Sequence, residues 1–148
     1  MKLKIDKQFI AVRAIIKKNE KFLIIRESNK YKDGTNHGLY DFPGGKLNIG
    51  ESAHKALLRE VKEEAGMKVK VLQPVFVDEW YPKVHGQQFQ IVGVFFMCEP
   101  IGKTIKLGSD HDEYKWITID ESKKYKLMPA VTNAFKVLND TRLPKQKN

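Results

Sequence analysis

Three glutamates lie within five residues of one another in a chain that is otherwise strongly basic. The chain has 148 residues, with 27 Lys and Arg against 18 Asp and Glu, so its formal net charge is +9. Glu60, Glu63 and Glu64 are spaced so that they share one face of a helix, where like charges repel by roughly 0.2–0.5 kcal/mol per pair. Carboxylate oxygens suit hard cations such as Mg²⁺ and Mn²⁺. A bound divalent ion would therefore relieve the repulsion and explain the cluster.

Residues beside the cluster extend the same chemistry. Glu51 precedes the expected helix and can supply a further carboxylate, and Arg59 can pair with a glutamate and fix its rotamer. The Gly44-Gly45 turn brings backbone close to the helix start, where phosphate oxygens are stabilised. Taken alone, the glutamates are also consistent with a solvated acidic face on a surface helix.

Runs rich in β-branched and aromatic residues predict the strands around this segment. These strands are expected at 8–16, 21–27, 68–80 with an interruption at Pro74, 88–100 and 113–119. The first two are expected to form a hairpin, followed by a polar loop at 28–38 and a short extended piece at 39–45. A turn or loop is expected at 81–86.

Two helices complete the expected domain. Ser52 is a good N-cap for a helix over 53–65, and Gly66 fits the position that ends it. Pro129 marks the first turn of a second helix, 130–140. This order of elements predicts an α/β domain with a mixed sheet between helices. We expect one domain over 1–148, with 141–148 as a loose tail.

Composition narrows the environment and the partners. Cys98 is the only cysteine and lies in an apolar run, so we expect a buried structural thiol and no disulfide. The N-terminus has no apolar signal region, and no apolar run approaches the roughly 20 residues of a membrane span. We therefore expect a cytoplasmic protein without membrane contact. The basic balance favours anionic partners such as nucleotides, but the scattered lysines indicate no specific nucleic-acid partner. The oligomeric state, a homodimer included, stays open.

The spacing over 45–67 strengthens the metal interpretation. In order, the segment contains Gly45, Glu51, Arg59-Glu60-Val61, Glu63-Glu64 and Gly66-Met67. It resembles the Nudix box, Gly-x5-Glu-x7-Arg-Glu-U-x-Glu-Glu-x-Gly-U with U an apolar residue, and every fixed position matches. The resemblance implies an α/β/α sandwich that hydrolyses a nucleoside diphosphate linked to another group, with Mg²⁺ or Mn²⁺ as cofactor.

The resemblance also implies roles for single residues. Glu60, Glu63 and Glu64 are expected as metal ligands, and Glu63 or Glu64 also as the base that activates water. Arg59 would orient a glutamate, and the backbone of Gly45 would contribute to the metal or phosphate site.

Two further sets of residues carry weaker expectations. Glu113 lies three residues before Trp116, near a point where many Nudix proteins have an acidic residue on a loop facing the metals. It is expected as a ligand or base, with a solvated loop carboxylate as the alternative.

The histidines show no paired ligand spacing and are expected at the surface. They are His37, His54, His85 and His111.

The substrate is less defined than the chemistry. The stretch 42–46, Phe-Pro-Gly-Gly-Lys, resembles MutT-type nucleoside triphosphate pyrophosphohydrolases. Pro82, sixteen residues after Gly66, is near the offset of an informal marker of ADP-ribose pyrophosphatases. We rank a nucleoside triphosphate first and ADP-ribose or an ADP-sugar second. A domain that only binds nucleotides is the alternative of another class, which the intact glutamates disfavour. The nucleoside is expected beside 76–90 and near Pro129.

Overall fold

The computed structural model describes residues 2–141, so the predicted tail at 141–148 lies outside these residues apart from Thr141. The helices are α1 (Ala53–Ala65) and α2 (Pro129–Thr141), with a 3-10 helix, η1 (Asp120–Lys124), before α2. The strands are β1 (Lys7–Lys18), β2 (Lys21–Glu27), β3 (Tyr40–Asp41), β4 (Gly44–Lys46), β5 (Lys68–Trp80), β6 (Lys83–Val84), β7 (Gln87–Ile101) and β8 (His111–Ile117).

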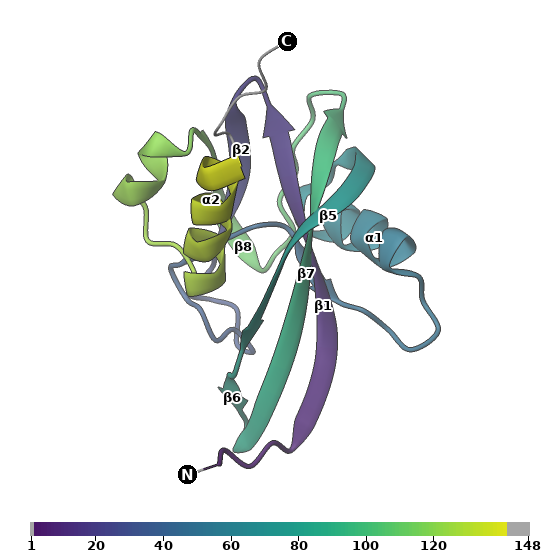
Figure 1. Cartoon of the computed structure of the whole chain (residues 1–148), viewed down its shortest axis with the longest axis vertical. Helices are drawn as coiled ribbons and strands as arrows, with labels where there is room; N and C mark the ends of the chain where they lie inside the picture. The colour runs from purple at the N-terminus through teal and green to yellow at the C-terminus, as the bar shows by residue number, and fades with distance from the viewer. Residues whose placement is uncertain (1, 142–148) are drawn as a thin grey trace.

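The strands form one mixed sheet in the order β3-β2-β1-β7-β5. β4 pairs with β1, β6 with β7, and β8 with β2. β1 and β7 run parallel, whereas the other pairs are antiparallel. Figure 1 shows that β1 and β7 continue well past the two helices and end near β6. The sheet is therefore covered on part of its length only.

Alternation along β1 sends its apolar side chains to two separate cores. Val12, Ala14 and Ile16 pack in the cluster that includes the buried face of α1. Ile15 points the other way and packs in the cluster that includes α2. Successive side chains of a strand point to opposite faces of the sheet, so the helices cover opposite faces. The predicted α/β/α sandwich with a mixed sheet is confirmed.

The ends of α1 are fixed by the residues that the pattern predicts. The backbone N–H of Lys55 donates to Ser52 Oγ at 3.1 Å, which satisfies one of the free donors of the first turn. Gly66 adopts φ 64° and ψ 22°, and its N–H donates to the carbonyl of Lys62 at 3.0 Å. The buried residues of α1 are Ala56, Leu57, Val61 and Ala65. The predicted helix over 53–65 is confirmed.

The strand predictions hold with local differences. Pro74 does not end β5; the register with β7 shifts on both sides of it, as expected for a proline on an edge strand. The predicted turn at 81–86 contains β6, and the predicted strand at 113–119 lies two residues earlier, as β8. Cys98 is buried, as expected. No helix within residues 2–141 has the length and apolarity of a membrane span.

Replacing Gly66 with Ala should destabilise the fold more than the matched change at Gly86. Both glycines have positive φ, 64° and 77°, where a side chain costs roughly 1–2 kcal/mol. At Gly66 the added Cβ would also lie 2.7 Å from the carbonyl oxygen of Lys106, whereas no described atom lies within 4 Å at Gly86. Urea unfolding of the two variants measures the difference. Equal losses would show that the Lys106 contact does not constrain the end of α1.

Candidate active site

The turn at Gly44-Gly45 and the helix α1 approach each other closely at the glutamates. β4 is held beside β1, with Gly44 opposite Arg13. The N–H of Gly44 donates to Glu64 Oε1 at 2.7 Å. A Cβ at Gly45 would lie 2.5 Å from Glu60 Oε2, so a side chain there would displace the Glu60 carboxylate. The predicted contribution of Gly45 to the site is thus supported by contact with a predicted ligand.

Glu60, Glu63 and Glu64 line one cavity of about 240 Å³, closed on its other side by residues 108–111. Their side chains differ in exposure: 14% for Glu60, 58% for Glu63 and 21% for Glu64. Two of the three carboxylates are therefore turned toward the protein, and one toward solvent.

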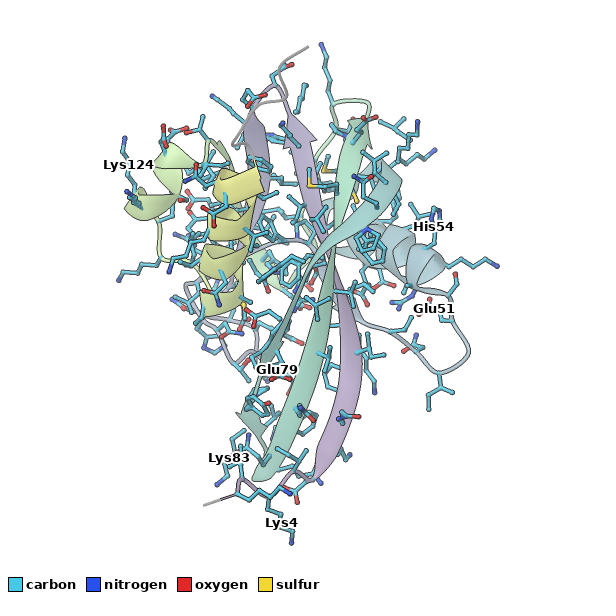
Figure 2. The ribbon with its side chains drawn as sticks, viewed as in Figure 1. Lys4, Glu51, His54, Glu79, Lys83 and Lys124 are labelled. Carbon is cyan, nitrogen blue, oxygen red and sulfur yellow. The ribbon has the colours of Figure 1, made fainter. Side chains whose placement is uncertain are left out.

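Arg59 forms hydrogen bonds with two neighbouring carboxylates. Its Nε and Nη2 donate to the two oxygens of Glu51 at 2.8 and 2.9 Å, and its Nη1 donates to Glu60 Oε1 at 2.7 Å. Glu63 Oε2 lies 3.6 Å from Nη1. The hydrogen bonds from Arg59 hold the pKa of Glu51 below its ordinary value. The predicted orienting role of Arg59 thus has a geometric basis; Figure 2 shows Glu51 beside the start of α1.

The glutamate side chains are not arranged as a set of metal ligands in this structure. Among the described residues, no three Asp, Glu, His or Cys side chains are grouped so that they could hold a metal ion. The expectation that three carboxylates meet at one point is therefore not met, because Arg59 holds Glu60 and Gly44 holds Glu64. The donors themselves are carboxylate oxygens around one cavity, which suit Mg²⁺ or Mn²⁺.

Glu64 is the glutamate whose electrostatics most favour a cation. Burial raises its pKa to about 8, and the nearby carboxylates of Asp41 and Glu60 add to the rise. The hydrogen bond from Gly44 and the charge of Arg13 act in the opposite direction without cancelling it. A divalent ion would stabilise the charged carboxylate, so the environment of Glu64 fits such an ion.

His111 lines the same cavity as the three glutamates, although its sequence spacing predicts a surface position. The N–H groups of Lys106 and Gly108 donate to the carbonyls of Ala65 and Glu64, which fixes this segment on the end of α1. The His111 side chain is 10% exposed, and its Nε2 lies 4.0 Å from Glu64 Oε2. Burial lowers its pKa, and its Nδ1 has no hydrogen-bond partner among the described residues. The surface expectation is wrong for His111, whereas the other three histidines are exposed.

Glu113 is not brought to the glutamates of α1. It lies in β8 opposite Arg26, whose Nη1 is 3.1 Å from Glu113 Oε2, and it accepts a hydrogen bond from the Tyr40 hydroxyl. That hydrogen bond, with the charges of Arg26 and Lys115, holds the pKa of Glu113 below its usual value. Glu113 lines neither cavity around the glutamates. A bulge explains this: His111 pairs with Glu27 and Glu113 with Arg26, so the two side chains face opposite sides.

A second cavity, of about 260 Å³, leads away from Glu64. Its polar end contains Gly44, Gly45, Glu64 and His111. Its apolar end contains Phe9, Trp80, Pro82 and Ile91. Such a cavity can hold an anionic group at one end and a flat apolar group at the other.

A third cavity, of about 370 Å³, continues from the apolar end toward α2. It shares Thr35, Asn36, Trp80 and Pro82 with the second cavity. Its lining also includes Tyr81, Pro129 and Asn133. The segments expected to hold a nucleoside, 76–90 and the chain near Pro129, therefore lie side by side along one cleft.

Comparisons with known proteins give a consistent match. The model of the NUDIX domain matches residues 7–139. An ADP-ribose pyrophosphatase of Methanocaldococcus jannaschii is 33% identical over 119 residues, which cover 78% of this chain and 64% of that protein. The chain thus spans slightly less than two thirds of this relative. A CTP pyrophosphohydrolase of Escherichia coli is 28% identical over 139 residues, covering 92% and 97% of the two chains. The crystal structure of a MutT protein from Methanosarcina mazei has a TM-score of 0.79 at 26% identity, covering 97% and 100%.

The free energy of unfolding of the metal-free protein should fall as pH rises through the titration of Glu64. Glu64 has a pKa near 4.3 in the unfolded chain and about 8 when folded. Folding therefore takes up a proton between these values. The resulting stability is fully present below the unfolded pKa and is lost as pH approaches 8, by at most about 1.4 kcal/mol per pH unit.

Glu64→Gln should remove this pH dependence, because the amide has no proton to lose. Urea unfolding in excess chelator at several pH values between 5 and 9 compares the variant with the wild type. Glu99→Gln, at an exposed position of β7, is the control and should keep the wild-type slope. Parallel profiles for wild type and Glu64→Gln would contradict the raised pKa.

Proposed function

The chain belongs to the NUDIX domain family, and from this premise we propose that it hydrolyses a phosphoric anhydride bond in a nucleotide with Mg²⁺ or Mn²⁺. The observation that carries the proposal is the close approach of the Gly44-Gly45 turn to Glu60 and Glu64, beside a cavity that all three α1 glutamates line. That arrangement puts acidic donors beside backbone that can approach phosphate.

The cation, when bound, supplies charge neutralisation of phosphate oxygens and a more acidic water. Glu60, Glu63 and Glu64 would hold it, with Gly45 as the adjacent backbone group. Arg59 keeps Glu60 in place through Nη1 and ties it to Glu51 before the helix. The protein's contribution is then placement and fixed charge, and it needs no covalent intermediate.

Glu64 is the better candidate for the base in the proposed reaction. Burial raises the pKa of Glu64 to about 8 without a cation, and a bound divalent ion would lower it and keep the carboxylate in the charged form that a base requires. The second oxygen of Glu64, Oε2, is the one that faces His111, while Oε1 is held by Gly44. We propose that Glu64 Oε2 takes the proton of the attacking water. Glu63, which is more exposed, is the alternative.

A nucleoside triphosphate is the substrate that we propose first. The cleft runs from the glutamates past Trp80 to the start of α2, so it offers space for a phosphate chain followed by a base. A relative that matches nearly the whole length of this chain acts, by its name, on CTP. Cleavage inside the phosphate chain would release a nucleoside monophosphate and pyrophosphate.

ADP-ribose or an ADP-sugar is the second proposal. Pro82 lines both cavities of the cleft, which together offer room beyond one nucleoside. The Methanocaldococcus jannaschii relative is named as an ADP-ribose pyrophosphatase. A domain that only binds nucleotides remains the third possibility, and it predicts no turnover of any nucleotide.

Product analysis in ¹⁸O-labelled water should separate these substrates. A panel of nucleoside triphosphates, ADP-ribose and an ADP-sugar is incubated with Mg²⁺ and the products are identified by mass spectrometry. The first proposal predicts nucleoside monophosphate plus pyrophosphate. The second predicts AMP plus ribose 5-phosphate from ADP-ribose, with poor turnover of triphosphates. Release of inorganic phosphate and diphosphate from a triphosphate would contradict the first proposal.

Glu63→Gln and Glu64→Gln should each lower turnover by about 100-fold or more while the fold persists. Each change keeps the shape of the side chain but removes the charge of a predicted metal ligand.

Mg²⁺ or Mn²⁺ should raise the melting temperature of the wild type and be required for turnover. Steady-state kinetics and thermal melts measure both effects, with Glu99→Gln as the control. Full turnover in excess chelator would rule out the metal.

A further inference from the structure

Arg13 is a half-buried cation in the cleft that the proposed chemistry does not use. It lies in β1 directly opposite Gly44, and its side chain is 13% exposed. The cavity that it lines also contains Glu64 and Trp80. Its Nε and Nη1 are buried and donate no hydrogen bond among the described residues. Buried donors nearly always have a hydrogen-bond partner, so we expect these two nitrogens to bind one.

Two neighbours hold the guanidinium without satisfying it. Asp41 Oδ2 lies 3.3 Å from Nε as an ion pair, but not in hydrogen-bond geometry. Asp41 Oδ1 meanwhile accepts from the N–H of Phe42 at 2.7 Å. The Arg13 Cζ lies 5.5 Å from the centroid of the Trp80 ring, within the range of a cation–π contact. The group is thus fixed in position while part of its donor capacity stays free.

The free donors of Arg13 indicate an anionic partner, in a cavity whose lining also contains the carboxylates of Glu27, Asp33, Asp41, Glu64 and Asp110. Arg13 lies between the polar end of the cavity, at Gly44 and Glu64, and the apolar end, at Trp80. Lys46 also lines this cavity, but its Nζ lies 5.2 Å from the centroid of the Phe9 ring. A planar guanidinium matches phosphate oxygens in geometry and charge.

We propose that Arg13 binds a non-bridging oxygen of the substrate phosphate nearest to the nucleoside. This inference rests on the proposed function, because it assumes that a nucleotide lies along the cleft with its phosphates toward Glu64. Arg13 would then connect the two ends of the cleft: it holds the phosphate at the point where the chain leaves the glutamates, and Trp80 holds Arg13. Substrates that lack a charged group at this point should bind less well.

The competing explanation is that Arg13 only balances the buried charge of Asp41. Removing one member of a buried ion pair destabilises a protein because the other charge is left unpaired. A loss of activity in an Arg13 variant would therefore be ambiguous. The double change Arg13→Gln with Asp41→Asn removes both charges, so it should recover stability while still lacking the guanidinium.

Isothermal titration of the full chain distinguishes the two explanations. AMP and CMP are the charged probes, and adenosine and cytidine are the uncharged controls. Arg13→Gln should weaken monophosphate binding about tenfold or more, with little change for the nucleosides. Arg13→Lys should recover part of the loss, since it keeps the charge. Lys17→Gln, on the same strand but paired with Glu20, removes equal charge and should change neither.

The double variant distinguishes phosphate binding by Arg13 from simple charge balance with Asp41. We expect it to melt near the wild-type temperature and still bind monophosphates weakly. Recovery of both melting temperature and affinity would overturn the inference, as would equal weakening for nucleosides and monophosphates in Arg13→Gln. A wild type that turns over nucleotides while Arg13→Gln binds normally would overturn this inference alone. A wild type that binds neither monophosphate and turns over no nucleotide would overturn the proposed function with it.

Discussion

The hydrogen bond from Gly44 to Glu64 connects the sheet to the helix that carries the glutamates, and the site depends on it. It requires β4 to pass close to α1 at Gly44, where a Cβ would lie 2.0 Å from the carbonyl oxygen of Val12 in β1. Burial beside this turn raises the pKa of the Glu64 carboxyl, although the hydrogen bond from Gly44 itself lowers it, and Glu64 Oε2 faces His111. The close approach of Gly44 thus fixes the position of the Glu64 carboxylate, while burial determines its protonation.

Charge balance is the second constraint on this region. Arg59 hydrogen-bonds to Glu51 and Glu60, whereas Arg13 forms an ion pair with Asp41 and its charge acts on Glu64. The two arginines therefore offset part of the negative charge of a dense group of carboxylates. The two arginines differ in free donors, since Arg59 donates to several partners and Arg13 has buried nitrogens without a partner within residues 2–141.

Local signals in the sequence were sufficient for most of the fold and for part of the site. Ser52 and Gly66 define α1 because a cap and a left-handed residue act on adjacent backbone, and runs rich in β-branched and aromatic residues locate the main strands. Contacts that depend on tertiary register could not be predicted in this way. The bulge in β8 places His111, and not Glu113, at the glutamates, and spacing counted along the chain does not reveal a bulge. A single arginine in a run of strand residues does not indicate a binding site. The proposed phosphate-binding role of Arg13 follows only from its position beside Asp41 and Trp80 in the folded chain.

The parallel pairing of β1 with β7 has a consequence for the order of assembly during synthesis. Phe9 pairs with Ile91, so the strand that carries Arg13 must wait for a partner that is made 82 residues later. Closing so long a loop is entropically costly and slows folding relative to local contacts. Helix α1 can form early from its own caps, but Trp80, β7 and the segment with His111 emerge afterward. A nascent chain on the ribosome can therefore display the complete glutamate helix well before it has a cleft in which to use it.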